Sequence, residues 1–170
     1  MVGICEPMNP GGHGAWGADL TCEGAPHQHY GGYLGRKKTM SVFYATAFGL
    51  VQAARIVRHL AKPEDTATIS STLEYVVDFM KGNSPKDQHE DAIPLQKRFR
   101  AAMQGFQATI GVVNKDWALD ADRAARQAVW DAIKKWPNHG VMCDVDPEAK
   151  PVPPPAAKKI TLDCFGGEPQ

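Results

Sequence analysis

The carboxylates of this chain are unevenly placed for hydrolytic chemistry. Asp122 lies in a strongly helical stretch, but no Asp or Glu precedes Glu6. None stands between Glu23 and Glu64, and residues 66–73 have none either. Divalent ions such as Mg²⁺ need clustered oxygen ligands, which are usually carboxylates. The first half of the chain therefore offers few ligands for a site that holds divalent ions.

Histidines and cysteines provide a second candidate, a zinc site. A hairpin over residues 15–34 could draw together His13, Cys22, His27 and His29, whose ring nitrogens and thiol are zinc-compatible ligands. Their spacing matches no strong zinc motif. A second set is weaker because a proline-rich stretch separates its last member from the others: His139, Cys143 and Cys164. We therefore predict no metal site from either set.

Two basic clusters could contact phosphate groups. The first, residues 36–38 (RKK), follows the hairpin. The second surrounds Phe99 and contains Lys97, Arg98 and Arg100. Such patches give salt-sensitive, sequence-independent binding, although two solvated faces remain the alternative interpretation. Nineteen basic residues balance nineteen acidic ones, so any contact with nucleic acid must be local.

Hydrophobic periodicity predicts alternating strands and helices that would position these residues. A glycine-rich hairpin over 11–35 precedes a long buried helix over 40–60. A short strand over 66–70 and a short helix ending near Gly82 come next. Three further elements complete the order: a helix over 91–104, a strand over 107–113 and a helix over 119–136.

Length and composition favour one globular domain with a tail. The chain has 170 residues, of which 43% are hydrophobic and 22% charged, enough to enclose a core. No apolar run is long enough to cross a bilayer. Widely spaced cysteines without a cleavable signal indicate a reducing, intracellular setting. Three tryptophans at or beside the last helix suit core packing or a partner interface better than base stacking: Trp117, Trp130 and Trp136.

The character of the sequence changes after Pro137. Five prolines favour an extended polyproline conformation: Pro147, Pro151, Pro153, Pro154 and Pro155. Beyond them lie residues 159–165 (KITLDCF), in which Ile160, Leu162 and Cys164 alternate with Thr161, Asp163 and Phe165. This segment could add as a strand to an edge of its own sheet or of a partner chain. We predict a domain over 1–137 and an extended attachment tail over 138–170, with the domain able to fold without the tail.

Residues 3–18 (GICEPMNPGGHGAWGA) resemble the first strand and hairpin of ribonuclease HI. In that family an aspartate precedes Gly-Ser/Ala-Cys, and Asn-Pro-Gly-Gly and Gly-Trp-Gly-Ala follow. Residues 113–122 (VNKDWALDAD) look like the family's Val-Pro-Arg-Glu-x-Asn-x-x-Ala-Asp. The resemblance covers roughly residues 1–136. It implies an α/β fold with a mixed five-stranded sheet, helices on both faces, and four acidic residues that hold two divalent ions.

Carried over residue by residue, most of these acids are missing. The family's first aspartate falls on Val2, and the glutamate of the long helix falls on Val42 or on a small deletion just before it. The next aspartate falls on Ser71 or Thr72, so that only Asp122 is retained. The family's paired asparagines before the glutamate are absent as well. The resemblance thus implies that the chemistry and part of the substrate recognition are lost together.

We therefore predict a catalytically inactive ribonuclease-H-like protein that acts as a binding or structural component of a larger nucleoprotein or virion assembly. One alternative is an active ribonuclease H that cleaves the RNA of RNA–DNA hybrids with Mg²⁺ and displaced acids such as Glu6, Glu74 or Asp78. The other alternative is a non-cleaving nucleic-acid-binding module.

The partners follow from these hypotheses. RNA or an RNA–DNA hybrid would contact six residues: Asn9, Lys37, Lys38, Lys97, Arg98 and Arg100. The tail would hold a protein partner. We expect no cofactor unless catalysis survives, no membrane contact, and a cytoplasmic location or one within an assembly.

Overall fold

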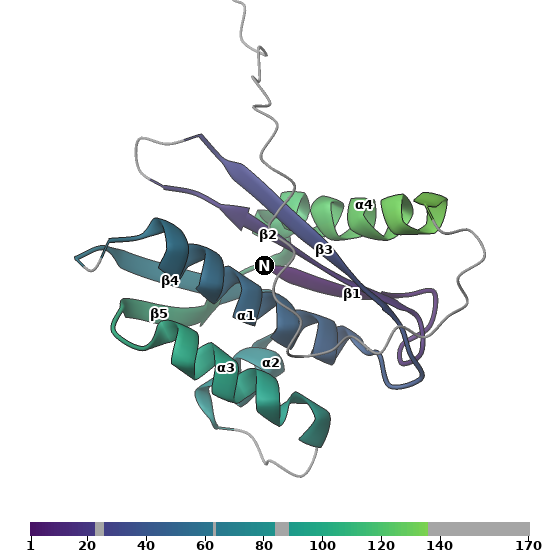
Figure 1. Cartoon of the computed structure of the whole chain (residues 1–170), viewed down its shortest axis with the longest axis horizontal. Helices are drawn as coiled ribbons and strands as arrows, with labels where there is room; N and C mark the ends of the chain where they lie inside the picture. The colour runs from purple at the N-terminus through teal and green to yellow at the C-terminus, as the bar shows by residue number, and fades with distance from the viewer. Residues whose placement is uncertain (23–25, 63, 84–88, 136–170) are drawn as a thin grey trace, which may run out of the picture.

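The computed structural model describes residues 1–22, 26–62, 64–83 and 89–135. The predicted tail, Trp136 and the second candidate zinc set lie outside these residues. The strands are β1 (Val2–Glu6), β2 (His13–Leu20), β3 (Gln28–Arg36), β4 (Thr66–Ser71) and β5 (Gln107–Val112) (Figure 1). The helices are α1 (Val42–Leu60), α2 (Glu74–Lys81), α3 (Ile93–Met103) and α4 (Leu119–Lys135). Short 3-10 turns precede α3 and α4, at η2 (Glu90–Ala92) and η3 (Lys115–Ala118).

The first three strands form an antiparallel sheet in the order β1-β2-β3. Strand β1 pairs with β2 from Val2, which lies opposite Gly17. Strand β2 pairs with β3 along its whole length. Residues 18–20 of β2 therefore run past the start of β1 and, among the described residues, pair with β3 alone.

The last two strands form a separate parallel ladder, with Ile69 of β4 opposite Ile110 of β5. The expected five strands are thus divided into two ladders in the described part of the chain. One hydrogen bond spans the junction, from the Met1 amino group to the Ser70 carbonyl oxygen over 2.9 Å. Met1 precedes β1, and no run of paired residues joins β1 to β4 in the described part of the chain.

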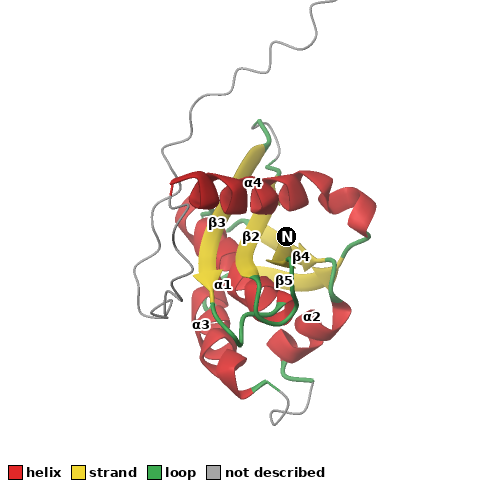
Figure 2. Ribbon diagram, turned by 90° about the vertical axis from the view of Figure 1, so that its right-hand side faces the viewer, coloured by secondary structure: helices red, strands yellow, loops and turns green. Residues whose placement is uncertain are grey.

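Helices cover both faces, as the sequence predicted. Helix α1 packs against β1 and β2 on the face that also carries α2 and α3 (Figure 2). Helix α4 lies across β2 and β3 on the opposite face. Its buried residues Ala125 and Val129 pack against Ile4 and Ala15 of the sheet. This division sends alternate side chains of β1 toward α1 and toward α4.

Local sequence signals explain where the helices begin and end. Ser41 caps α1, because its side chain accepts a hydrogen bond from the Tyr44 amide at 3.0 Å. Helix α2 ends at Gly82, whose φ of 93° is a left-handed conformation that favours glycine. None of the helices in the described residues is long and apolar enough to cross a membrane.

Candidate nucleic-acid interface

Val2 occupies the position that the resemblance assigns to the first aspartate. It is half-buried and packs with Ile4, Ala125 and Val129 between β1 and α4. An aliphatic side chain suits this environment, because burial of apolar surface stabilises the contact between sheet and helix. It offers no ligand atom to a metal ion.

The residue of α1 that lies against the start of β1 is Thr46, which the sequence reasoning did not single out. A Cβ added to Gly3 would overlap the Thr46 backbone nitrogen and lie 2.5 Å from its Oγ1. Thr46 is fully buried, and its Oγ1 has no hydrogen-bond partner among the described residues. Val42 lies one turn earlier, where its amide donates to Asn9 Oδ1 at 3.1 Å. Both helix positions are neutral.

The end of β4 carries hydroxyls where the resemblance places another aspartate. Ser71 is fully buried, and its Oγ accepts a hydrogen bond from the Leu73 amide at 3.4 Å. Thr72 is half-buried just beyond the strand. A serine buried this deeply on the N-terminal side of α2 could have been recognised only from the fold, because small polar residues are equally common in turns.

Asp122 is engaged by an arginine. Arg126, one turn later on α4, donates from Nε to Asp122 Oδ2 at 2.7 Å and from Nη2 to Asp122 Oδ1 at 3.5 Å. Its Nη1 donates to Glu6 Oε1 at the end of β1. The hydrogen bonds to these two carboxylates, that of Asp122 first, raise the pKa of Arg126. We call this cluster the Glu6–Arg126–Asp122 triad.

The residues do not fit the two divalent ions that the resemblance implies. Val2, Thr46 and Ser71 are neutral, and a permanently charged guanidinium lies between the two carboxylates nearby. A Mg²⁺ ion would have to displace this cation and would gain at most two carboxylate ligands from the triad. The arrangement therefore stabilises α4 against β1 rather than holding metal ions.

Basic and amide groups gather instead at the start of α1. Besides the bond that the Val42 amide donates to Asn9, the Gly11 amide donates to the Met40 carbonyl at 2.8 Å, which ties the β1–β2 loop to the helix. Lys37 Nζ lies 4.1 Å from the centroid of the Tyr44 ring. Lys38 is exposed beside it. The first turn of α1 contains no acidic residue, so its positive helix end favours anions.

The second basic cluster is divided by the fold. Arg98 of α3 is half-buried. Burial, and then the Asp91 carboxylate, raise the pKa of Tyr44 against a smaller opposing effect of the Arg98 guanidinium. Arg100 turns to α2, where its Nη2 donates to the Lys81 carbonyl at 3.3 Å. Lys97 is exposed. The structure thus places Asn9 and Lys37 at the start of α1, and Arg100 against α2.

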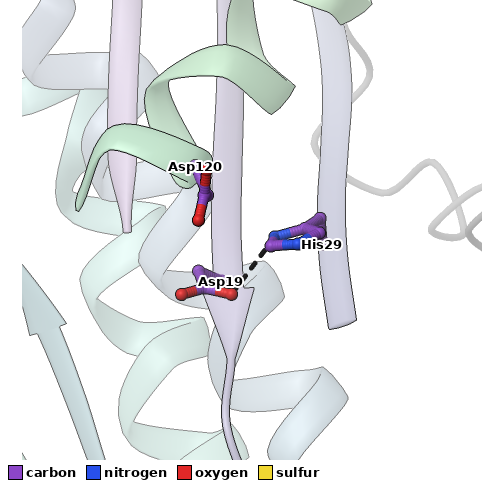
Figure 3. A group of neighbouring side chains, drawn as sticks. All are labelled: Asp19, His29 and Asp120. Carbon is purple, nitrogen blue, oxygen red and sulfur yellow. Dashed lines mark ion pairs between the residues drawn. The ribbon is translucent and has the colours of Figure 1, made fainter. Parts of the chain in front are cut away.

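The histidines of the first candidate zinc set do not all come together. His13 and His29 lie at opposite ends of the β2–β3 pair, and His13 Nδ1 contacts the Tyr33 hydroxyl at 2.7 Å. His29 Nδ1 instead lies 3.2 Å from Asp19 Oδ1, and Asp120 stands beside them (Figure 3). Their ligand atoms lie within 4.8 Å of one another, but Asp120 also pairs with an exposed arginine. We interpret this group as an Asp–His ion pair beside α4.

Two of the three tryptophans are not core residues. Trp117 in η3 is 81% exposed and Trp130 on α4 is 61% exposed. Core packing is therefore wrong for both, and a partner interface stays a prediction.

Comparison with known proteins identifies the fold. No protein-family model and no curated protein matches the sequence. The structure is similar to RNase H1 of the halophilic archaeon Halobacterium salinarum NRC-1, with TM-score 0.65 and 19% identity over 76% of this chain and 94% of that one. It is also similar to the N-terminal RNase H domain of a Mycobacterium tuberculosis protein, solved as a fusion with maltose-binding protein. There the TM-score is 0.65 and the identity 21%, over 79% of this chain and 93% of that one.

A third similar structure is LC11-RNase H1 in complex with an RNA/DNA hybrid, with TM-score 0.52 and 14% identity over 75% of this chain and 93% of that one. The chain therefore has a ribonuclease H-like fold, and this part of the sequence prediction is confirmed.

Proposed function

We propose that this protein is a non-cleaving ribonuclease-H-like module that binds the phosphate backbone of an RNA–DNA hybrid or of RNA. The observation that carries the proposal is the Glu6–Arg126–Asp122 triad, in which the retained aspartate is bound by a guanidinium. The other positions of the family's acidic set are neutral. At these positions the described residues thus offer no cluster of free carboxylates, so we expect no two-metal hydrolysis of a phosphodiester.

Binding is supported by the surface at the start of α1. Lys37 and Lys38 lie beside Asn9 at a helix end that lacks acidic residues. Such groups contact phosphates without reading bases, so the affinity would fall steeply with salt. A similar fold has been solved in complex with an RNA/DNA hybrid, which makes a hybrid duplex the first ligand to test.

The proposal is tested by incubating the full chain with a labelled RNA–DNA hybrid and Mg²⁺ or Mn²⁺, and scoring cleavage and gel shift together. We expect a salt-sensitive shift and no cleavage. The double substitution Lys37→Ala, Lys38→Ala should weaken binding, whereas Lys62→Ala should not, because exposed Lys62 follows the opposite end of α1. Cleavage that Asp122→Asn abolishes would show an active enzyme, and the absence of any shift would refute binding.

The exposed tryptophans favour a second candidate role, as a component of a larger nucleoprotein or virion assembly. Trp130 lies on the exposed side of α4. Exposed tryptophans are enriched in protein–protein interfaces. Sedimentation of the chain with a hybrid duplex tests this role. A species with several chains per duplex that Trp130→Ser abolishes supports it, and a single chain per duplex opposes it.

A further inference from the structure

An open slot separates the two ladders. It is a cavity of about 500 Å³ whose walls come from β2, α1, β4 and η3. Leu20 lines it from β2, Ile56 and Val57 line it from α1, Ile69 lines it from β4, and Trp117 lines it from η3. Side chains distant in sequence therefore surround one channel beside the start of β1, and polar residues, among them Asp19, Thr68 and Ser70, also line it.

Two strand edges face this slot. Residues 18–20 of β2 extend past the start of β1 and, among the described residues, pair with β3 alone. Among the described residues, strand β4 pairs with β5 alone, apart from the single bond between Met1 and Ser70 at the end of the slot. In the described part of the chain, backbone donors and acceptors of both strands thus remain open toward the same space. Such unpaired edges are templates for one further strand.

The walls specify which side chains this strand should carry. On one side, Ile56 and Val57 of α1 require apolar side chains. On the other side Trp117 is 81% exposed, so polar side chains there can reach water. The slot therefore fits a strand with one fully apolar face and one mixed face.

Residues 160–165 (ITLDCF) have this pattern. Ile160, Leu162 and Cys164 form an apolar set, and Thr161, Asp163 and Phe165 alternate with them. We propose that this segment fills the slot of its own chain as an additional strand, with the apolar set toward α1. Trp117 would then be covered in part, and the two ladders would become one continuous sheet.

The length of the chain permits this return. Helix α4 has 17 residues, or about 25 Å of helix, and Ala121 in its first turn lines the slot. To reach the slot from the end of α4, the tail must therefore span about the length of this helix. The 24 residues 136–159 span on the order of 25 Å even as a flexible chain, and about 70 Å when extended. This inference does not depend on nucleic-acid binding, which uses the start of α1.

Hydrogen exchange of the full chain tests the proposal. Leu162→Pro removes a backbone donor from the added strand, and Ala149→Pro places a proline in the linker as a matched control. We expect peptides covering residues 18–22 and 66–71 to exchange at least about tenfold faster in Leu162→Pro than in wild type. Ala149→Pro should leave them unchanged. Equal exchange in wild type and Leu162→Pro would overturn the proposal.

Two further measurements keep the result specific. Residues 43–54 of α1 report on global unfolding, because most of them are buried. If Leu162→Pro also accelerates their exchange, Ile160→Asp provides the test instead, since it alters a side chain and leaves the backbone donors in place. Protection of the slot that rises with protein concentration, together with a dimer in light scattering, would mean that a second copy donates the strand. That outcome would refute docking within one chain.

Discussion

Arg126 binds Asp122 through two nitrogens on α4, with Nε 2.7 Å from Oδ2. The same guanidinium reaches Glu6 at the end of β1. The one acid retained from the expected catalytic set is therefore part of a structural ion-pair cluster between a strand and a helix. Because its oxygens already accept charge-assisted hydrogen bonds, Asp122 is a poor ligand for a metal ion.

The triad makes a modest contribution to stability. Its side chains are 34% to 47% exposed, so solvent screens their attraction. We expect Arg126→Ala to lower the free energy of unfolding by about 0.5–1 kcal/mol at low salt, and by less at about 0.5 M salt. Urea unfolding at the two salt concentrations measures both values.

Arg123→Ala is the matched control for this change. Arg123 forms one ion pair, with Asp120, and its side chain is 76% exposed. Arg123→Ala should lower the free energy of unfolding by less than Arg126→Ala does under the same conditions. Equal losses for the two variants would show that the link between α4 and β1 adds nothing.

The sequence predicted the order of elements because its signals are local. Three such signals act within a few residues: the short β-compatible segments of the hairpin, the three- and four-residue spacing of apolar residues in α1, and the glycine at the end of α2. Residues 3–18 also carried the resemblance that led to the fold. The sequence could not show that the hydrogen bond from Met1 to Ser70 links the two ladders, because strand pairing depends on contacts between distant segments.

The site was harder to predict than the fold. Asp122 and the missing acids were visible in the sequence, but Arg126 was not recognised as the partner of Asp122, although its i,i+4 spacing was a usable signal. Thr46 was missed because a buried threonine on an apolar helix face looks like core. The separation of Arg98 from Arg100 follows from helix geometry and the neighbours of α3, which a linear cluster does not reveal.

Gly17 permits α4 to approach the sheet closely. A Cβ at this position would overlap the Ala121 carbonyl oxygen and lie 2.7 Å from the Ala125 amide nitrogen. We expect Gly17→Ala to destabilise the protein by about 1–3 kcal/mol, because the backbone of α4 must shift. Gly111→Ala is the control, since its nearest neighbour is the Ser70 Oγ at 3.6 Å. Thermal unfolding midpoints that agree for the two variants would contradict this close packing.

Cys5 should react far more slowly than Cys22. Burial raises the pKa of the Cys5 thiol, and its Sγ donates to the Met8 carbonyl at 3.0 Å, so the reactive thiolate is scarce. Cys22 is exposed. In a chain carrying Cys143→Ser and Cys164→Ser, iodoacetamide should modify Cys22 first, with Cys5 labelled only on unfolding. Mass spectrometry over time measures both rates, and comparable labelling of the native protein would refute the prediction.

His13 should make the stability of the protein depend on pH. Burial, and then the nearby Arg36 guanidinium, lower the pKa of His13 below its usual value of 6.5. As the pH falls below 6.5, His13 is protonated in the unfolded chain but stays neutral in the folded protein. The free energy of unfolding therefore decreases until the pH falls below the pKa of His13 in the folded protein. His13 Nδ1 lies 2.7 Å from the Tyr33 hydroxyl oxygen. We expect His13→Gln to reduce the loss of unfolding free energy between about pH 7.5 and about pH 5, measured with urea. His59→Gln, at the exposed end of α1, should retain the wild-type loss. A loss in His13→Gln as large as that of wild type would mean that other groups govern acid sensitivity.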